Sequence, residues 1–560
     1  MKMEKMPEVI KTKDGVFWKN TYEKFEARVY VPVTKLQGDI LNYGFNAPYL
    51  LVFADKPLDE AEQLAFARQH GFEKLASDFD SSVVFISPLS EKGQPCNWKE
   101  AAPDILSEII SNSKIHQYHK DGVVIANNVF RHSIDGYFIR GAIFRIMLCG
   151  FGTGADYIAE NCLHHFEGDG LWGRSDLAPA TCVLTGLSVA PEVGADDIPV
   201  ISYGNSAEAN ELFQSRCKHF LKRDSAPSAQ EFLSDYYSFA RQFRRMNGPL
   251  QIDPDLEKEG LVIEPGIAEV KTSPDNCGDD KGSASHKIGY FAFYNKGLFE
   301  SEAAKSGGVP LVLGFHGGGD SCFFFSTMAG WAKICHRHNF LLVTIENHLN
   351  STATEMVELL EILKKKYPID STRIYATGFS MGGCKTWDMI QEYPEVLAAA
   401  APMDATFDVG CNVYGNKVVS ICPDGHSTTG GSINTAVPVP VFYAGGEVTP
   451  LPELPFQAQK CLDRMAYTLL LNNAELADRY EEEVKLENKD KWENKIWGIN
   501  GDEVETSYDE SRDATLTMQK FRSTDGRILS IFASISGQGH DCREHTCEHA
   551  WNFMSQFTRK

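Results

Sequence analysis

A serine in the G-F-S-M-G stretch at residues 378–382 has the sequence context of a catalytic nucleophile. The apolar residues 374–376 before it predict a strand, and the amphipathic residues 385–390 after it predict a helix. On such a G-x-S-x-G turn, the nucleophile elbow, the serine stands clear of its backbone and the glycines let neighbouring chain approach. The following helix also directs free N–H groups and partial positive charge at the serine. We therefore predict Ser380 as a nucleophile; the alternative is a tight glycine-rich turn with a bystander serine.

A catalytic serine needs a base, and His540 is the expected one. It lies in G-Q-G-H-D, just after a predicted strand at residues 528–535 and before a closing helix at 548–557. His545 and His549 are rivals that lie in the following turn or helix.

The base needs an acid to orient it, and two strand ends offer one. Glu447 ends G-G-E after a predicted strand at 437–444, and Ser380, Glu447 and His540 follow the chain order nucleophile, acid, base. Asp404, at the end of the preceding strand, is the main rival, and Glu453 is a weaker one. We predict Glu447 as the acid.

A second glycine motif, F-H-G-G-G-D at residues 315–320, follows an apolar run at 309–315 that suits a buried parallel strand. Bare backbone N–H groups in such a run can hold the oxyanion of an acyl-transfer intermediate. We expect one donor from Gly318 and the other from Met381, the residue after the nucleophile. The further candidates for substrate binding are His316, Gly317, Gly319, Asp320 and Phe379.

The segment from His540 to His549 also contains Cys542, His545 and Cys547, a composition seen in metal sites. Its spacings match no zinc pattern. We expect neither a metal nor a cofactor.

These motifs need a scaffold, and from about residue 289 the chain alternates apolar strands with helices. Such alternation predicts an α/β fold with a mostly parallel sheet covered by helices on both faces. Two long insertions interrupt it, a Gly-, Asn- and Ser-rich one at 406–435 and a charged one at 471–511. Loops of this length often carry function.

The first half of the chain repeats this pattern. Residues 145–154, R-I-M-L-C-G-F-G-T-G, align with 373–382, and Gly152 falls where Ser380 stands. After the strand at 49–53 no glycine run follows, and Ser206 falls near the place of Glu447. The shared order of elements indicates an internal duplication that lost its nucleophile; two unrelated α/β segments are the alternative. Such a half would serve packing, dimerisation or pocket walls.

With these motifs, the half from about residue 285 resembles an α/β-hydrolase of the feruloyl esterase and polyhydroxybutyrate depolymerase type. The resemblance rests on H-G-G-G, the G-F-S-M-G-G elbow, and a G-x-G-H histidine before a W-x-F helix. It implies hydrolysis of a carboxylic ester through an acyl-enzyme, with Ser380 as nucleophile, His540 as base, and Gly318 and Met381 as oxyanion donors. Such enzymes usually carry an aspartate as the acid, so Glu447 departs from the pattern.

We accordingly predict a degenerate α/β-hydrolase-like domain at 1–250, a linker at 251–287 and a catalytic domain at 288–560. The triad alone leaves open a peptidase or amidase, or an acyltransferase, and a non-catalytic scaffold is a further alternative. The expected partner is a small-molecule ester, with a homodimer possible.

The net charge and the cysteine content limit which binding partners and which compartment we expect. The chain has 54 Lys and Arg against 76 Asp and Glu, a net charge of −22, which argues against binding nucleic acid or an anionic membrane. No stretch has the length of a membrane span, and the start lacks a signal-peptide h-region. Its 14 cysteines lack a framework spacing, so we expect reduced thiols in a cytoplasmic protein.

Overall fold

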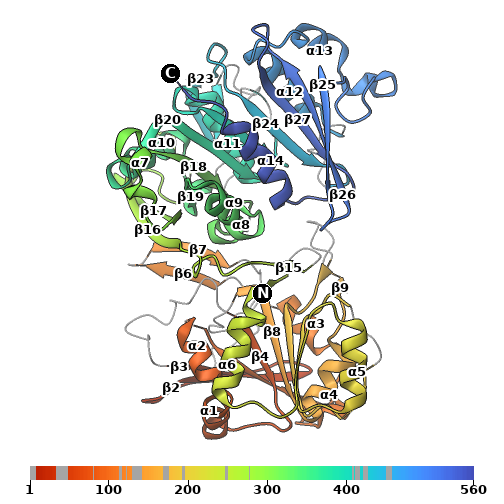
Figure 1. Ribbon diagram of the computed structural model, residues 1–560. Helices are drawn as coiled ribbons and strands as arrows, with labels where there is room; N and C mark the ends of the chain where they lie inside the picture. Colours follow the sequence, from red (N-terminus) through yellow and green to blue (C-terminus); the bar gives the residue numbers. More distant parts are fainter. Residues whose placement is uncertain are drawn as a thin grey trace. The chain divides into compact units, whose positions relative to one another are not determined.

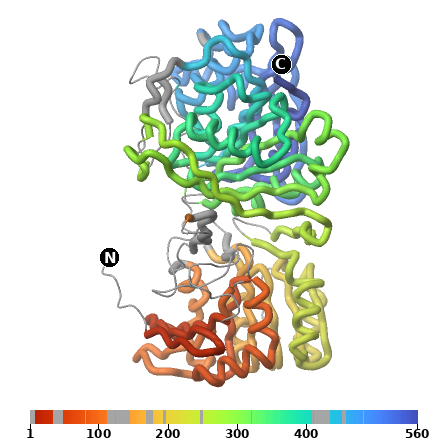
Figure 2. Tube along the Cα trace, turned by 90° about the vertical axis from the view of Figure 1, so that its left-hand side faces the viewer, coloured from red at the N-terminus to blue at the C-terminus, as the bar shows by residue number. Residues whose placement is uncertain are grey.

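The computed structural model divides the chain into two compact units (Figure 1). Unit 1 comprises residues 1–119, 127–170 and 174–255, and unit 2 comprises 120–126, 171–173 and 256–560. In Figure 2 the red-to-yellow chain belongs mainly to unit 1 and the green-to-blue chain to unit 2. The structure describes residues 8–32, 48–79, 81–112, 116–120, 123–128, 142–167, 176–188, 190–191, 196–245, 250–276, 278–318, 320–406, 409, 417–420, 427–449 and 457–559.

The centre of unit 2 is a ten-stranded sheet of order β16-β17-β19-β18-β20-β21-β24-β27-β26-β25, counted over the described residues. The six strands from β19 to β27 run parallel, and antiparallel strands flank them at both edges. The central parallel strands β18, β19, β21 and β24 are mostly apolar because helices cover both faces of the sheet. The strands are β16 Leu261–Lys271, β17 Ser285–Asn295, β18 Val309–Phe315, β19 Leu341–Ile345, β20 Ile369–Phe379, β21 Ala399–Met403, β24 Val441–Gly446, β25 Glu503–Asp509, β26 Ala514–Arg522 and β27 Ile528–Ile535.

Two sets of helices cover this sheet. Helices α8, α9 and α14 pack against one another, whereas α10, α11 and α12 share a hydrophobic core with the strands. Helix α10 begins with a capping box of Thr352 and Glu355 and ends with three lysines, as helix electrostatics favour. The helices are α7 Glu302–Gly307, α8 Cys322–Met328, α9 Trp331–His338, α10 Ala353–Lys366, α11 Met381–Glu392, α12 Gln459–Leu471, α13 Ala477–Glu483 and α14 Glu544–Met554.

Three expectations differ from the structure of unit 2. The sequence pattern over residues 325–338 predicts one helix, but the structure has two, α8 and α9, because the chain turns at Gly330 with φ 75°. The segment expected as a linker, 251–287, contains β16 and the start of β17. Polar residues alternate along β16 because it is an edge strand with one face outward. The charged insertion at 471–511, whose middle the sequence predicts as helical, contains α13 and also the edge strand β25, which was not expected.

Unit 1 is built on a nine-stranded sheet of order β1-β2-β3-β5-β4-β8-β11-β12-β13, again over the described residues. Its run from β2 to β13 repeats the run from β16 to β27 of unit 2, strand by strand, in both order and direction. The strands are β1 Val9–Lys11, β2 Gly15–Thr21, β3 Phe25–Pro32, β4 Pro48–Phe53, β5 Val83–Pro88, β8 Ala142–Phe151, β11 Thr181–Thr185, β12 Val200–Tyr203 and β13 Phe220–Arg223.

The helices of unit 1 also form two sets, one on each of two hydrophobic cores. They are α1 Glu60–Gln69, α2 Phe72–Asp78, α3 Ile105–Asn112, α4 Thr153–Asn161, α5 Ala207–Arg216 and α6 Ala229–Ser238. Short two-stranded pairs complete the described strands: β6 His116–Lys120 with β7 Val123–Asn128, β9 Phe166–Glu167 with β10 Asp176–Leu177, β14 Phe243–Arg244 with β15 Gln251–Ile252, and β22 Lys417–Ser420 with β23 Ser427–Ser432.

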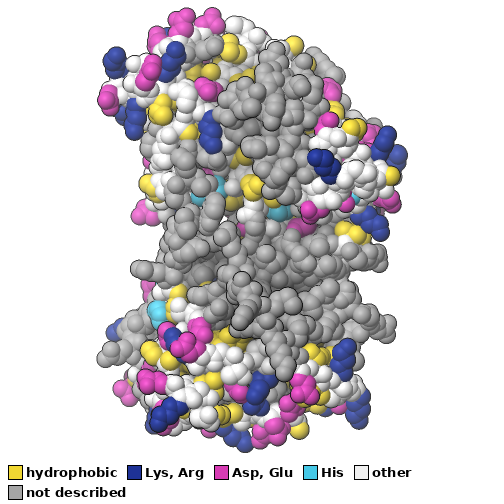
Figure 3. All heavy atoms as spheres, turned by 180° about the vertical axis from the view of Figure 1, so that it is seen from behind, with side chains coloured by type: hydrophobic (Ala, Val, Ile, Leu, Met, Phe, Trp, Pro, Cys, Tyr) yellow, Lys and Arg dark blue, Asp and Glu magenta, His cyan; other side chains and the backbone are white. Residues whose placement is uncertain are grey.

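The described surface mixes its charges. On the face in Figure 3, Lys and Arg side chains are interspersed with Asp and Glu side chains, so the described part of that face offers no concentrated basic patch. None of the described helices combines the length and apolar character needed to cross a bilayer.

Candidate active site

Ser380 occupies a strained turn between β20 and α11. Its backbone has φ 55° and ψ −122°, a region that non-glycine residues enter rarely. A Cβ on Gly378 would lie 2.2 Å from the Gly382 carbonyl oxygen, and one on Gly382 would lie 2.1 Å from the Phe315 carbonyl oxygen. Both glycines of the motif are therefore required by close backbone contacts. The Ser380 N–H donates to Met403 O at 3.0 Å, which fixes the turn to β21.

His540 lies beside this turn, in the loop between β27 and α14. The imidazole is buried, and its ring centroid lies 4.6 Å from that of Phe379, the residue before the nucleophile. The structure thus brings the predicted base to the elbow. The rival His545 instead contacts Ser507 Oγ at 2.9 Å, and its ring lies 5.0 Å from that of His549.

Asp404 faces His540 from the end of β21. Its Oδ2 lies 3.9 Å from His540 Nδ1, and the side chain is 1% exposed. Two backbone N–H groups donate to the carboxylate, Gly446 to Oδ1 at 2.9 Å and Asp541 to Oδ2 at 3.1 Å. Burial raises the pKa of Asp404 to about 8, although these two N–H groups act in the opposite direction.

Glu447, the acid expected from the sequence, has a different partner. Its Oε1 accepts a hydrogen bond from the Ser534 hydroxyl at 2.9 Å, and its own N–H donates to Ile535 O. The geometry therefore favours Asp404 over Glu447 as the group that orients His540. Glu453 lies outside the described residues.

The glycine run after β18 lies against the elbow. A Cβ on Gly318 would lie 2.3 Å from Met381 Sδ, and one on Gly317 would lie 3.1 Å from the Phe379 ring. The two expected oxyanion donors, Gly318 and Met381, thus belong to segments in contact. Met381 is the first residue of α11, so the helix itself supplies no acceptor for its N–H.

The side chains around this run hold it in place. The ring nitrogens of His316 lie 2.7 Å from Gly317 O and 2.8 Å from Glu346 O, and the imidazole is buried. Asp320 is also buried, and its N–H donates to Gly317 O at 3.1 Å. These contacts indicate support of the loop rather than exposure to a substrate. Gly319 lies outside the described residues.

Three sulfur atoms cluster beside the His540 loop, and the sequence pointed to Cys542 and Cys547 but not to Met403. Cys542 Sγ lies 3.3 Å from Met403 Sδ and 3.5 Å from Cys547 Sγ, and all three side chains are buried. The neighbouring Cys547 thiol and burial together raise the pKa of Cys542. The cluster joins β21, the His540 loop and α14. The position of Cys542 two residues after His540 was the available signal.

Unit 1 contains the same turn without a nucleophile. Gly152 has φ 53° and ψ −122°, nearly the backbone of Ser380. A Cβ on Gly154 would lie 2.2 Å from Phe53 O, the same approach that Gly382 makes to Phe315. Asp55 then accepts from the Thr153 N–H at 3.0 Å and from its hydroxyl at 2.8 Å. An internal carboxylate therefore occupies the helix N-terminus that corresponds to Met381.

Ser206, which the sequence placed near the position of Glu447, caps α5 instead. Its hydroxyl accepts a hydrogen bond from the Ala209 N–H at 3.2 Å. This is the ordinary role of a serine at a helix N-terminus.

Two curated proteins are similar to the chain in sequence, whereas no family model matches it. A bifunctional acetylxylan esterase/xylanase from Neocallimastix patriciarum is 20% identical over 258 residues, covering 44% of this chain and 31% of that protein. A poly(3-hydroxyalkanoate) depolymerase C from Paucimonas lemoignei is 27% identical over 114 residues, covering 17% of this chain and 27% of that protein. The match spans less than a third of the length of either relative.

Solved structures also align with about half of the chain. An acetyl xylan esterase from Aspergillus awamori is 13% identical with a TM-score of 0.32, covering 52% of this chain and 99% of that chain. An S-formylglutathione hydrolase from Staphylococcus aureus is 11% identical with a TM-score of 0.31, covering 52% of this chain and 99% of that chain. The strand order of unit 2 and the elbow between β20 and α11 are those of an α/β-hydrolase fold.

Proposed function

We propose that unit 2 hydrolyses carboxylic esters, with Ser380 as nucleophile, His540 as base and Asp404 as the orienting acid. The observation that carries the proposal is the strained Ser380 elbow beside the buried His540–Asp404 pair. Strain at a serine next to a histidine and a carboxylate is the arrangement that activates a hydroxyl for acyl transfer.

In this reaction Ser380 Oγ attacks the ester carbonyl carbon, and its proton moves to His540 Nε2. The tetrahedral intermediate collapses, the C–O bond to the alcohol breaks, and His540 returns the proton to the leaving oxygen. Water then attacks the acyl-enzyme by the same route and releases the carboxylic acid. Asp404 holds the Nδ1 side of the imidazole, so that Nε2 faces the serine, and stabilises the imidazolium that forms.

The negative oxygen of the intermediate needs donors, and Gly318 and Met381 are proposed to supply them. Their segments touch, and backbone N–H groups in a buried site stabilise developing charge strongly. Phe379 packs on the His540 ring and keeps it from turning away.

The names of the two relatives support esters as the substrate class. One is an acetylxylan esterase/xylanase and the other a poly(3-hydroxyalkanoate) depolymerase, and both substrates are carboxylic esters. We propose the shared chemistry, a carboxylic ester, without choosing between a short acetyl group and a polyester.

A fluorophosphonate probe and p-nitrophenyl acetate test this function. We expect one labelled residue, Ser380, and hydrolysis of the ester with much slower cleavage of an aminoacyl-nitroanilide. Preferential anilide cleavage would indicate a peptidase, and dominant transfer to an added alcohol would indicate an acyltransferase. An unlabelled protein would exclude a serine hydrolase.

The rate should rise with pH through about 8. Burial raises the pKa of Asp404 to about 8, and the carboxylate, rather than the neutral acid, stabilises the imidazolium. Because Asp404 and His540 are close, the measured pKa belongs to the pair. A pH profile of kcat/KM for p-nitrophenyl acetate, corrected for alkaline hydrolysis, checks this expectation. A flat profile between pH 6 and 9 would contradict it.

We also propose that unit 1 is a duplicated hydrolase fold without catalytic activity. Its strand order, the backbone of Gly152 and the close approach of Gly154 support a common origin with unit 2. Asp55 supports the loss of activity, because its carboxylate occupies the donor group that an oxyanion would need.

Restoring the serine alone should therefore fail. In a Ser380→Ala background, Gly152→Ser should give no fluorophosphonate label, since a Cβ there would lie 2.7 Å from Asp55 Oδ1. The carboxylate would also repel an oxyanion at Thr153. Intact-mass spectrometry after labelling checks this. A phosphonylated serine at position 152 would overturn the assignment of unit 1 as inactive.

A further inference from the structure

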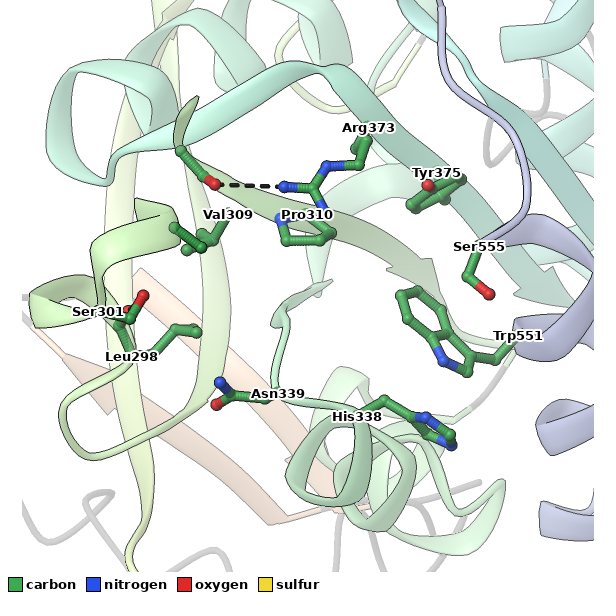
Figure 4. A pocket seen from close by; sticks show the side chains of 12 residues that line it. Leu298, Ser301, Val309, Pro310, His338, Asn339, Arg373, Tyr375, Trp551 and Ser555 are labelled. Atoms are coloured by element: carbon green, nitrogen blue, oxygen red, sulfur yellow. Dashed lines mark hydrogen bonds between the residues drawn. The ribbon is translucent and has the colours of Figure 1, made fainter. Parts of the chain in front are cut away.

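A pocket of about 210 Å³ opens in unit 2 at the amino ends of β18 and β20 (Figure 4). Ser380 follows the carboxyl end of β20, and the glycine run follows the carboxyl end of β18. The seven residues of β18 span roughly 20 Å. The pocket is therefore separate from the candidate active site.

Arg373 provides the charge at this pocket. Its Nε donates to Asp370 Oδ2 at 2.6 Å, and Nη2 donates to Gly308 O at 3.3 Å, the bond that Figure 4 marks. Among the described residues these are its hydrogen-bond partners, so N–H groups on both Nη atoms remain for a ligand. The side chain is 34% exposed, and the planar end of a guanidinium matches the two oxygens of a carboxylate.

Asn339 faces Arg373 across the pocket (Figure 4). It joins α9 to β19 in a left-handed conformation with φ 58°, which asparagine tolerates better than most residues. Its Oδ1 accepts from Asn295 Nδ2 at 3.1 Å. This bond orients the amide so that its own NH₂ group can donate to a ligand.

The remaining walls combine apolar side chains with the polar groups of Ser301, His338, Tyr375 and Ser555. Trp551 lines one side, and its ring stacks on Phe340 with centroids 4.0 Å apart. Leu298 and Pro310 line the other side. These walls suit a compact apolar body.

Two acidic groups next to the pocket have cationic partners. Asp370 pairs with Arg373, and Glu548 pairs with Arg337 and with the pocket residue His338. The Asp370 carboxylate offsets part of the charge of Arg373, but it binds only Nε, so the N–H groups on both Nη atoms remain for a ligand. A pair of guanidinium N–H donors favours an anionic acceptor such as a carboxylate.

We propose that this pocket is a binding site for a small carboxylate with an apolar body. The carboxylate oxygens would bind the two Nη atoms of Arg373 and the Asn339 amide, and the apolar body would pack against Trp551, Leu298 and Pro310. A volume of about 210 Å³ suits a compact ligand such as benzoate. The proposed esterase reaction releases carboxylic acids, but the site stands on its own residues.

Ligand-observed NMR titration with benzoate, and with benzamide as its neutral counterpart, tests the site. We expect saturable benzoate binding, at least tenfold weaker binding of benzamide, and at least tenfold weaker benzoate binding by Arg373→Met. Arg527→Met is the matched control, because this exposed arginine pairs with Asp525 away from the pocket, and it should bind benzoate as the wild type does.

A second variant protects the test from misfolding of Arg373→Met. Ala303 lies exposed on α7 at the pocket wall, so Ala303→Phe should fill the opening and also abolish binding. Benzoate that does not bind, that binds Arg373→Met and Ala303→Phe as it binds the wild type, or that binds no better than benzamide would overturn the proposal. Benzoate that binds at the catalytic centre instead would bind both variants as it binds the wild type, which is the second of these results. Failure of the esterase proposal is separate, because it would appear as an unlabelled Ser380.

Discussion

Ser380→Ala should lower kcat for p-nitrophenyl acetate by roughly 10⁴–10⁶-fold and abolish fluorophosphonate labelling. The variant removes only the attacking oxygen. Alanine keeps the Cβ at φ 55°, so the strained turn, the Met403 hydrogen bond and the contacts of both motif glycines are unchanged. The thermal unfolding temperature should therefore match that of the wild type. Any rate that remains above the rate of uncatalysed hydrolysis would come from the oxyanion donors.

Ser306→Ala is the matched control for this change. Ser306 is an exposed serine on α7 whose hydroxyl donates to carbonyls of its own helix. This control should keep full activity and the label at Ser380. Turnover retained by Ser380→Ala would show that another group is the nucleophile, and loss of both activity and thermal stability would show that the turn itself had been disturbed.

The parts of unit 2 that the sequence predicted well are those with one dominant physical signal. The buried strands β18 and β27 are largely apolar runs, so their positions follow from hydropathy. The elbow was predictable because Gly378 and Gly382 are required by close backbone contacts, and such contacts leave glycine in the sequence. The buried strands and the elbow can therefore be predicted from short stretches of the sequence.

Edge strands and helix breaks were harder to predict. The edge strand β25 is mostly exposed and carries Glu503, Glu505 and Asp509, so its composition resembles that of a loop. It forms because β26 provides a partner for its backbone, which the segment's own residues do not reveal. The break between α8 and α9 depends on the conformation of Gly330, in a run otherwise suited to one helix.

The choice of acid could not be made from the sequence, because two carboxylates follow neighbouring parallel strands in the correct chain order. Asp404 and Glu447 both lie at strand ends in the same sheet. What separates them is the path of the His540 loop, whose Asp541 N–H bonds to Asp404, and the position of Ser534 beside Glu447. Both depend on contacts between segments more than 80 residues apart in the chain.

Two matched substitutions decide between these carboxylates. Asp404→Asn should lower kcat/KM by roughly 10⁴-fold, because an amide can neither stabilise the imidazolium nor hold the same imidazole tautomer. Glu447→Gln should retain activity within about tenfold, since the glutamine can still accept the Ser534 hydroxyl bond. The opposite ranking would make Glu447 the acid.

Stability measurements separate loss of catalysis from loss of fold in the Asp404→Asn variant. Burial raises the pKa of Asp404 to about 8, so the folded protein binds this proton more tightly than the unfolded chain, whose aspartate pKa is about 3.9. The contribution of this group to stability is therefore complete below about pH 4 and is lost as the pH rises through about 8. Asparagine does not titrate, and it tolerates the positive φ of this position. Thermal unfolding at pH 5 and pH 9 should then show a smaller pH-dependent loss for Asp404→Asn than for the wild type. A variant that is inactive yet relatively more stable at pH 9 would identify Asp404 as a carboxylate buried for catalysis at a cost in stability. A folded variant that keeps its activity would contradict the assignment.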